Sequence, residues 1–276
     1  MGRVKILSMG DRIRAGTYAV QSRFARSVLL LDANGRALFV VDRSIGAGPL
    51  NLVVAQPAIF VAGESVAIAF PRRGRRGLPK GSEWSRHDLV PGSQAPRFDS
   101  ALPRLGRAAR AQLRRVLAAA LPRHAPPDSL VSLFFPAKRL PRLQLSRDLI
   151  FRTALEQIAA GRIAAGVRSI RGCGAGLTPA GDDFLCGWMT ALRLRGRTSA
   201  IPAILKHALG TNPVSNAFLK LSAQGRVNAA MKKLLESPSS ARVKAVCAFG
   251  HSSGADWLCG LAWGLGKEVG NGSSAP

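Results

Sequence analysis

A short pattern of glycine, aspartate, aromatic, leucine, cysteine and glycine residues occurs twice in the C-terminal half of the chain. The first copy is GDDFLCGW at residues 181–188, and the second is GADWLCGL at residues 254–261. In register, Asp183 matches Asp256, and a glycine follows each of them four residues later. Each copy leads into an apolar run, as the first turn of a buried helix does. The repeat therefore predicts two equivalent helices that meet across a local pseudo-twofold axis, with glycine where they approach most closely.

Both motif aspartates are expected in the first turn of their helices, with Asp182 beside them. Clustered carboxylates share a proton or bind a divalent cation, because bare like charges repel one another. A purely structural explanation stays open, since the helix macrodipole alone favours aspartate in a first turn. The predicted catalytic residues are Asp182, Asp183, Asp256 and His251, and the predicted metal ligands, for Mg²⁺ as the candidate ion, are Asp182, Asp183 and Asp256.

The segment GCGAGLTPAG at residues 172–181 precedes the first copy. Glycine at this density leaves backbone amides bare, and a loop that feeds a helix N-terminus is a ready anion site. Thr178-Pro179 is typical of a helix start, with a capping hydroxyl and then proline at the first helical position. The TNPVS run at residues 211–215 has a similar composition.

On these grounds the predicted ligand-binding residues are Gly174, Gly176, Thr178, Gly181, Thr211, Ser215, Ser252, Ser253 and, as part of a second wall of the site, Asn51. Helix capping explains the hydroxyl residues about as well, and a tight β-turn is the simpler explanation of residues 46–51. His251 is suited to act as an anion donor or a general acid/base, with a capping role as the alternative.

The chain is strongly basic, with a net charge of +25 over 276 residues and many arginines between residues 71 and 123. Such a charge often indicates a polyanionic partner. The sequence has a single tyrosine, however, and it shows neither interleaved aromatic and basic residues nor a recognisable DNA-binding motif. Nucleic acid is therefore a disfavoured partner, and we expect a small anionic substrate instead.

The N-terminal part of the chain predicts strands, and the C-terminal part predicts mostly helices. Residues 27–42 read as a hairpin that turns at Asn34-Gly35. Residues 130–135 are expected to form one further short strand, while residues 147–165 and 213–235 are each expected to form one helix. No apolar run is long enough to cross a membrane and no signal peptide is evident, so a cytoplasmic location is expected.

The predicted fold class is therefore α+β, with a β-rich N-terminal half, a small barrel or sandwich, followed by a mostly helical C-terminal half. We expect two domains. Residues 1–100 form the β-rich domain, with a basic loop at residues 71–100. Residues 101–276 form the helical domain that carries both motifs.

Several of these motifs resemble one bacterial family. They are GAGLTPAGDDFLCG at residues 174–187, HSSGAD at 251–256, the helix start at 211–215, SRF at 22–24 and GAGPLN at 46–51. The family is that of the AllH-type subunit of the oxamate carbamoyltransferase of anaerobic allantoin breakdown, and the resemblance spans nearly the whole chain.

The resemblance implies a subunit of an enzyme that moves a carbamoyl group between phosphate and the amide of oxamate. It also implies other subunits of the same enzyme, or further copies of this chain, as partners. The alternative is a non-catalytic subunit that binds a ligand or acts as a scaffold, with motif glycines that only pack helices together.

Overall fold

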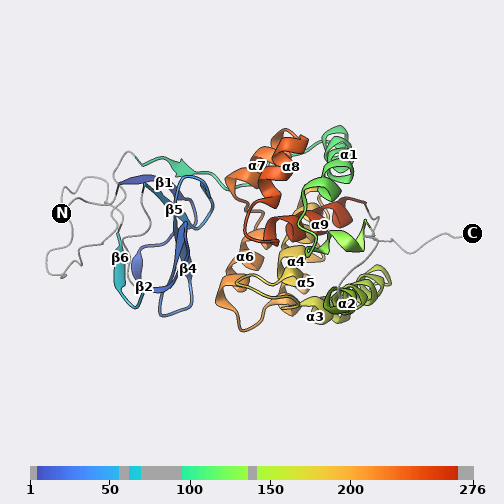
Figure 1. The fold of residues 1–276 in the computed structure, drawn as a ribbon, viewed down its shortest axis with the longest axis horizontal. Helices are drawn as coiled ribbons and strands as arrows, with labels where there is room; N and C mark the ends of the chain where they lie inside the picture. Colours follow the sequence, from blue (N-terminus) through green and yellow to red (C-terminus); the bar gives the residue numbers. More distant parts are fainter. Residues whose placement is uncertain (1–4, 56–61, 70–94, 136–141, 267–276) are drawn as a thin grey trace, which may run out of the picture. The chain divides into compact units, whose positions relative to one another are not determined.

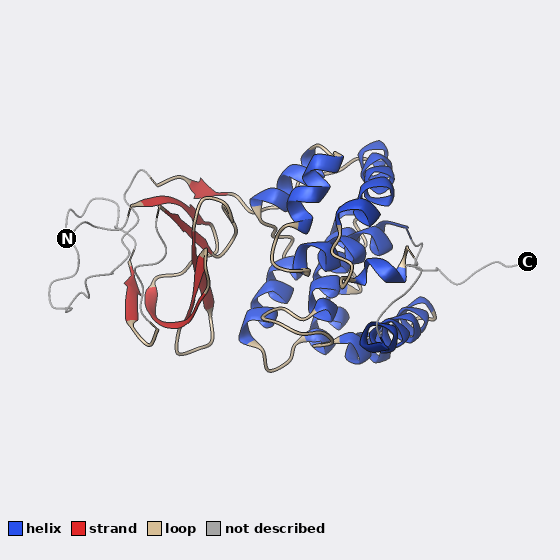
Figure 2. Ribbon diagram, viewed as in Figure 1, coloured by secondary structure: helices blue, strands red, loops and turns tan. Residues whose placement is uncertain are grey.

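The structure is a computed structural model that describes residues 5–55, 62–69, 95–135 and 142–266. The chain divides into two compact units: unit 1 is Met1–Ala101 with Val227–Ala229, and unit 2 is Leu102–Arg226 with Ala230–Pro276. Strands make up unit 1 and helices make up unit 2 (Figure 2). The predicted α+β class, with a β-rich N-terminal half and a helical C-terminal half, is confirmed.

The division into two domains, residues 1–100 and 101–276, stays a prediction. Most of the basic loop expected at residues 71–100 lies outside the described residues.

Unit 1 is a single curled sheet of mixed strand direction (Figure 1). Its strands lie in the order β6-β2-β3-β4-β5-β1-β7. The pairs β4/β5 and β1/β7 are parallel, and the other pairs are antiparallel. The expected small barrel or sandwich is thus one sheet that curls like half a barrel. In chain order the described strands are β1 (Ile6–Gly10), β2 (Gly16–Arg23), β3 (Ser27–Leu31), β4 (Ala37–Val41), β5 (Asn51–Val54), β6 (Ser65–Ile68) and β7 (Arg97–Phe98).

The hairpin of β3 and β4 forms as the Asn-Gly turn predicts. Gly35 has a φ of +69°, which favours glycine, and its N–H donates to the Asp32 carbonyl oxygen at 2.9 Å. One face of the sheet then buries every second residue of each long strand, as strand geometry requires. That apolar face consists of Tyr18, Val20, Val28, Leu30, Leu38, Val40, Leu52, Val54, Val66 and Ile68, with Ile13 beside them.

Unit 2 is built from short helices around a buried central pair, α4 and α9 (Figure 1). No described helix is long and apolar enough to cross a membrane. The described helices are α1 (Arg107–His124), the 3₁₀ turn η2 (Leu130–Leu133), α2 (Arg142–Ala159), α3 (Ile163–Ile170), α4 (Ala180–Leu194), α5 (Ile201–Ala208), α6 (Pro213–Ala223), α7 (Ala229–Glu236), α8 (Ser240–Cys247) and α9 (Ser253–Gly266).

Three local predictions were wrong. The strand expected at residues 130–135 is absent, and residues 130–133 form the 3₁₀ turn η2, because a short apolar run has no periodicity that separates the two. The helix expected at 147–165 is interrupted at Gly161 (φ +81°), and the one expected at 213–235 is interrupted at Gly225 (φ +71°). After Gly225 the chain continues in a non-helical stretch, in which the Val227 N–H donates to the Ser100 carbonyl oxygen at 2.9 Å.

α4 and α9 approach each other through bare backbone at two glycines. A Cβ at Gly187 would lie 1.9 Å from the Trp257 carbonyl oxygen, and a Cβ at Gly260 would lie 2.0 Å from the Phe184 carbonyl oxygen. Phe184 and Trp257 hold equivalent places in the two motif copies, so the contact is reciprocal about the local axis. The predicted close approach of the two helices at glycine is confirmed.

The helix before each motif takes part in the same symmetry. A Cβ at Gly181 would lie 1.8 Å from the Ile170 carbonyl oxygen of α3, and a Cβ at Gly254 would lie 1.8 Å from the Val246 carbonyl oxygen of α8. The repeated unit is therefore a helix pair, α3–α4 and then α8–α9. Between these anchor points the first loop is three residues longer than the second.

We expect Gly187→Ala to lower the free energy of unfolding by about 3 kcal/mol, because the new methyl group meets backbone that cannot rotate away. Gly266→Ala is the matched control at the end of α9, where a Cβ meets nothing within 4 Å. That control should stay within about 1 kcal/mol of the wild type, since alanine favours helix. Urea unfolding measures both, and equal stability of the wild type and Gly187→Ala would contradict the close contact.

Candidate functional site

The two motif loops meet at a hydrogen bond between side chains. The Thr178 hydroxyl oxygen lies 2.9 Å from the Ser253 hydroxyl oxygen, 75 residues further along the chain. α4 begins at Ala180 with Pro179 as its N-cap, and no side chain caps it. The predicted capping role of Thr178 is therefore wrong, and its hydroxyl instead joins the first motif loop to the start of α9.

Asp183 is buried in the first turn of α4, next to this hydrogen bond. Burial raises the pKa of its carboxyl well above the ordinary value, and the charge of Asp256 raises it further. The hydroxyls of Ser253 and Thr178 lower that pKa in part. One carboxyl oxygen, Oδ2, is buried without a hydrogen-bond partner. Desolvation thus outweighs the helix macrodipole and shifts the Asp183 carboxyl toward its neutral form.

Asp256, the equivalent residue of α9, is 0% exposed. Its Oδ1 accepts a hydrogen bond from the Leu130 backbone N–H at 2.7 Å, while its Oδ2 is buried without a partner. Burial raises the pKa of this carboxyl to about 6, against the lowering effects of the Leu130 N–H, the Ser252 hydroxyl and the Arg147 charge. Asp183 and Asp256 therefore form a coupled pair of buried acids at the two helix starts.

Asp182 is also buried but faces the glycine-rich loop. Its Oδ1 accepts from the Gly172 N–H at 2.8 Å, which closes the loop onto α4. Burial raises the pKa of Asp182, while the Gly172 N–H, the nearby Ser215 hydroxyl and the Arg171 charge lower it. Ser215 is close enough to affect this carboxyl, but its hydroxyl makes no hydrogen bond of acceptable geometry.

The glycine-rich loop presents free amides. Gly174 and Gly176 have φ values of +119° and +97°, which side chains rarely adopt. Residues 174–177 are exposed, and their N–H groups donate no hydrogen bond within the described structure. Gly181 instead serves packing, through its contact with Ile170. The loop therefore combines unused donors with the N-terminus of α4, as an anion site requires.

Asn212 is a residue of this region that the sequence did not single out. Its Oδ1 caps α6 by accepting from the N–H groups of Val214 (2.9 Å) and Ser215 (3.2 Å). Its Nδ2 donates to the Leu177 carbonyl oxygen at 3.0 Å and so tethers the glycine-rich loop. Thr211, which was predicted to bind ligand, is exposed beside this cap. The sequence predicted a polar cap at this helix start, but it did not predict the hydrogen bond from Asn212 to the glycine-rich loop.

His251 lies at the surface before α9, and its Nε2 is 2.6 Å from Oδ2 of Asp128. Asp128 precedes η2, and the Leu130 N–H that binds Asp256 comes two residues later. The sequence missed both Asp128 and Leu130, because no motif marks them. Thus His251 and Asp256 of the second motif contact the same short stretch of chain.

Asn51 belongs to unit 1, where it closes a turn. Its Nδ2 donates to the Gly46 carbonyl oxygen at 2.9 Å, and Gly46 has a φ of +79°. The tight turn that the sequence left open is formed. A role for Asn51 in ligand binding stays a prediction.

A cation at the aspartates gains no support from the arrangement. Among the described residues, no group of three or more His, Cys, Asp or Glu side chains could hold a metal ion. Asp182 and Asp256 are instead bonded to two separate backbone amides. The metal role of Asp182, Asp183 and Asp256 stays a prediction.

A cavity of about 850 Å³ lies elsewhere in unit 2, along α1 and the C-terminal half of α9. Its walls are mostly apolar and include Leu117, Leu121 and Trp263, with Arg114 and Arg115 among the lining residues. None of the predicted site residues lines it. The motif chemistry, which combines buried acids with free amides, therefore belongs to the helix starts rather than to this cavity.

The fold and these contacts define a class of protein, a helical unit built on a duplicated helix pair that buries two acids at its paired helix starts. The family model of the oxamate carbamoyltransferase subunit AllH matches residues 170–265, from the end of α3 through nearly all of α9. The family resemblance seen in the sequence is thereby confirmed over residues 170–265, where the chain is similar to the AllH family. No curated protein and no solved structure matched the chain significantly.

The buried acid on α9 predicts an unusual pH dependence of stability. The folded-state pKa of Asp256 is raised from 3.8 to about 6, so the folded protein holds an extra proton between these values. This contribution makes stability fall as the pH rises from about 4 to about 6, and the loss persists above that range. In Asp256→Asn the side-chain oxygen still accepts the Leu130 N–H without a charge.

We therefore expect the stability advantage of Asp256→Asn over the wild type to be small at pH 4, to grow by about 2–3 kcal/mol as the pH rises past 6, and to stay level up to pH 8, since two pKa units correspond to about 3 kcal/mol. Urea unfolding of both proteins across this range measures the difference. A difference that does not change with pH would show that Asp256 does not carry the raised pKa.

Proposed function

We propose that this chain is a subunit of a carbamoyltransferase-type enzyme, and that it binds a small anionic ligand at the paired starts of α4 and α9. The observation that carries the proposal is the hydrogen bond between Thr178 and Ser253, which brings the two motif loops together. The free amides of residues 174–177 lie on one of these loops. The family match, to a named subunit of an oxamate carbamoyltransferase, supports the reaction class.

The raised pKa of Asp183 supports an anion site beside a cluster of acids. An ionised carboxylate beside the free amides would repel a phosphate or carboxylate ligand. A protonated Asp183 does not repel it and can donate a hydrogen bond to it. The amides of Gly174 and Gly176 would then hold the anionic group, with the hydroxyls of Thr178, Ser252 and Ser253 nearby.

The predicted catalytic residues take different parts in this proposal. Asp183 and Asp256 would store and exchange a proton during carbamoyl transfer, as a coupled acid pair can. His251, whose Nε2 lies 2.6 Å from Oδ2 of Asp128, would act as a general acid/base at the surface. Asp182 would act on the loop rather than on substrate, because its carboxyl bonds the Gly172 N–H.

The wider setting follows from the family alone. We propose a cytoplasmic enzyme of purine and allantoin catabolism, with other subunits of the same enzyme, or further copies of this chain, as partners. The described helices include none that could span a membrane. Carbamoyl phosphate, oxamate and oxalurate are the ligands whose anionic groups suit the loop.

The second candidate is a non-catalytic subunit that binds ligand or serves as a scaffold. The glycine contacts favour it, since Gly181, Gly187, Gly254 and Gly260 are all required by close packing against backbone. The complete burial of Asp256 also fits a structural acid. In its scaffold form this candidate predicts that none of the proposed ligands binds at the motif loops.

A binding experiment with the purified chain separates the two candidates. Carbamoyl phosphate, oxamate, inorganic phosphate and Mg²⁺ are each titrated while the melting temperature and the Kd are measured. We expect carbamoyl phosphate to stabilise the wild type, and Asp183→Asn and Thr178→Val to weaken its binding tenfold or more, about 1.4 kcal/mol. Ser169→Ala removes an exposed hydroxyl of α3 that bonds only within its own helix, and it should bind normally.

If no ligand shifts the wild type, and the two site variants change only the melting temperature, the scaffold function is the correct one. Binding to duplex DNA that weakens steeply with salt would instead favour a nucleic-acid partner for the basic surface.

A further inference from the structure

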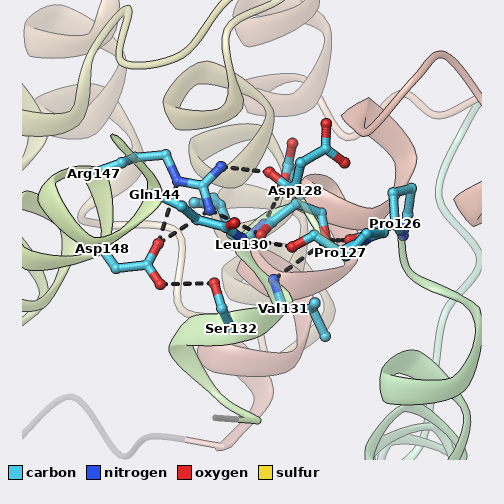
Figure 3. Close-up of polar contacts among 11 residues, drawn as sticks. Pro126, Pro127, Asp128, Leu130, Val131, Ser132, Gln144, Arg147 and Asp148 are labelled. Carbon is cyan, nitrogen blue, oxygen red and sulfur yellow. Dashed lines mark hydrogen bonds and ion pairs between the residues drawn. The ribbon is translucent and has the colours of Figure 1, made fainter. Parts of the chain in front are cut away.

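The stretch of chain that supports the second motif is itself held by one arginine. We propose that Arg147 of α2 is a positioning residue for Asp256, and that it acts through residues 126–132, called here the support segment (Figure 3). The importance of Asp256 for ligand binding rests on the proposed function. The mechanical link from Arg147 to Asp256 does not.

The Arg147 guanidinium binds two successive carbonyl groups of the support segment. Its Nη1 donates to the Asp128 carbonyl oxygen at 2.5 Å, and its Nη2 donates to the Ser129 carbonyl oxygen at 2.9 Å. Asp148 holds the same guanidinium from the other side, with Oδ1 3.1 Å from Nη2. A planar guanidinium can serve these acceptors together, and a lysine ammonium cannot reproduce that geometry.

Two further bonds from α2 fix the segment at its ends. The Ser132 hydroxyl donates to Oδ2 of Asp148 at 2.7 Å, and Nε2 of Gln144 donates to the Pro127 carbonyl oxygen at 2.6 Å. Figure 3 shows Arg147 and Asp148 facing the support segment, with the guanidinium reaching toward Asp128. Between these anchors lies Leu130, whose N–H donates to Asp256.

The position of Leu130 matters because the buried carboxyl of Asp256 has few hydrogen-bond partners. The Leu130 N–H is a backbone group, so its direction is set by the path of the support segment and not by a rotamer. The same segment carries Asp128, whose carboxylate holds His251. Arg147 therefore sets the position of both motif contacts from outside the motif. Its positive charge also lowers the pKa of Asp256, in the same sense as the hydrogen bond.

The test measures hydrogen exchange of the Leu130 amide in the full chain. Arg147→Lys keeps the positive charge but loses the planar guanidinium that binds two carbonyl groups at once. Arg147→Met loses both the charge and the guanidinium. Arg152→Met is the matched control, because Arg152 is an exposed arginine five residues further along α2. We expect at least tenfold faster exchange at Leu130 in both Arg147 variants, with amides in the middle of α4 unchanged and Arg152→Met like the wild type.

Unchanged exchange at Leu130 in both Arg147 variants would overturn the proposal. If Arg147→Met does not fold, Arg147→Lys and Gln144→Ala decide instead. Gln144→Ala removes only the bond to Pro127, so a smaller acceleration at Leu130 is expected from it. No acceleration in Arg147→Lys and Gln144→Ala would again overturn the proposal.

A second readout separates positioning from a general loss of stability. The Kd for carbamoyl phosphate is measured for Arg147→Lys, for Asp256→Ala, which removes the acceptor of the Leu130 N–H, and for the double variant. We expect each single change to weaken binding at least fivefold, and the double variant to bind no more weakly than Asp256→Ala alone. Additive losses would show that Arg147 acts independently of Asp256, and they would overturn the proposal. If the wild type does not bind carbamoyl phosphate, the proposed function fails, and the exchange of Leu130 alone decides the positioning role.

Discussion

The reciprocal contact between α4 and α9 is the constraint on which the rest of unit 2 depends. Each helix presents a glycine to a carbonyl oxygen of the other, so the two backbones touch without side chains between them. This spacing puts the first turns of both helices within reach of one another. The bond between Thr178 and Ser253, and the coupling of Asp183 to Asp256, both follow from it. Wider spacing would leave two ordinary helix starts, each with its own solvated aspartate.

Burial then decides the chemistry of these aspartates. A solvated aspartate at a helix N-terminus has a lowered pKa, because the macrodipole favours its charge. Here desolvation is the largest influence on Asp182, Asp183 and Asp256, and it raises the pKa of each. A buried carboxyl with one oxygen lacking a partner is most stable when protonated. A loop of free amides and a cluster of acids can therefore lie next to each other without strong charge repulsion.

The features of this structure that depend on local sequence patterns could be predicted from the sequence. The register of the repeat predicted the helix pair and its glycine contact, and Asn34-Gly35 predicted the β-hairpin. The helix interruptions at Gly161 and Gly225 could also have been predicted, because glycine often ends a helix. Each of these glycines takes a left-handed conformation that does not fit inside a helix. Local patterns did not predict the contacts made by Leu130, Asp128 and Arg147. Leu130 acts through a backbone N–H and Arg147 acts on backbone carbonyls, so neither contact leaves a side-chain pattern. They reach the motif from more than a hundred residues away in the sequence.

The unequal loops of the two helix pairs divide the repeat into specialised halves. In both copies the loop lies between fixed anchor points, a glycine against the carbonyl of the preceding helix, so its length can change without moving the helices. The longer first loop has exposed amides, whereas the second motif is tied to the support segment by Asp256 and His251. A change in the length of the first loop would therefore leave both helix pairs and the second motif in place. The two copies of one structural unit thus combine a loop that can vary in length with a loop that its contacts hold in position.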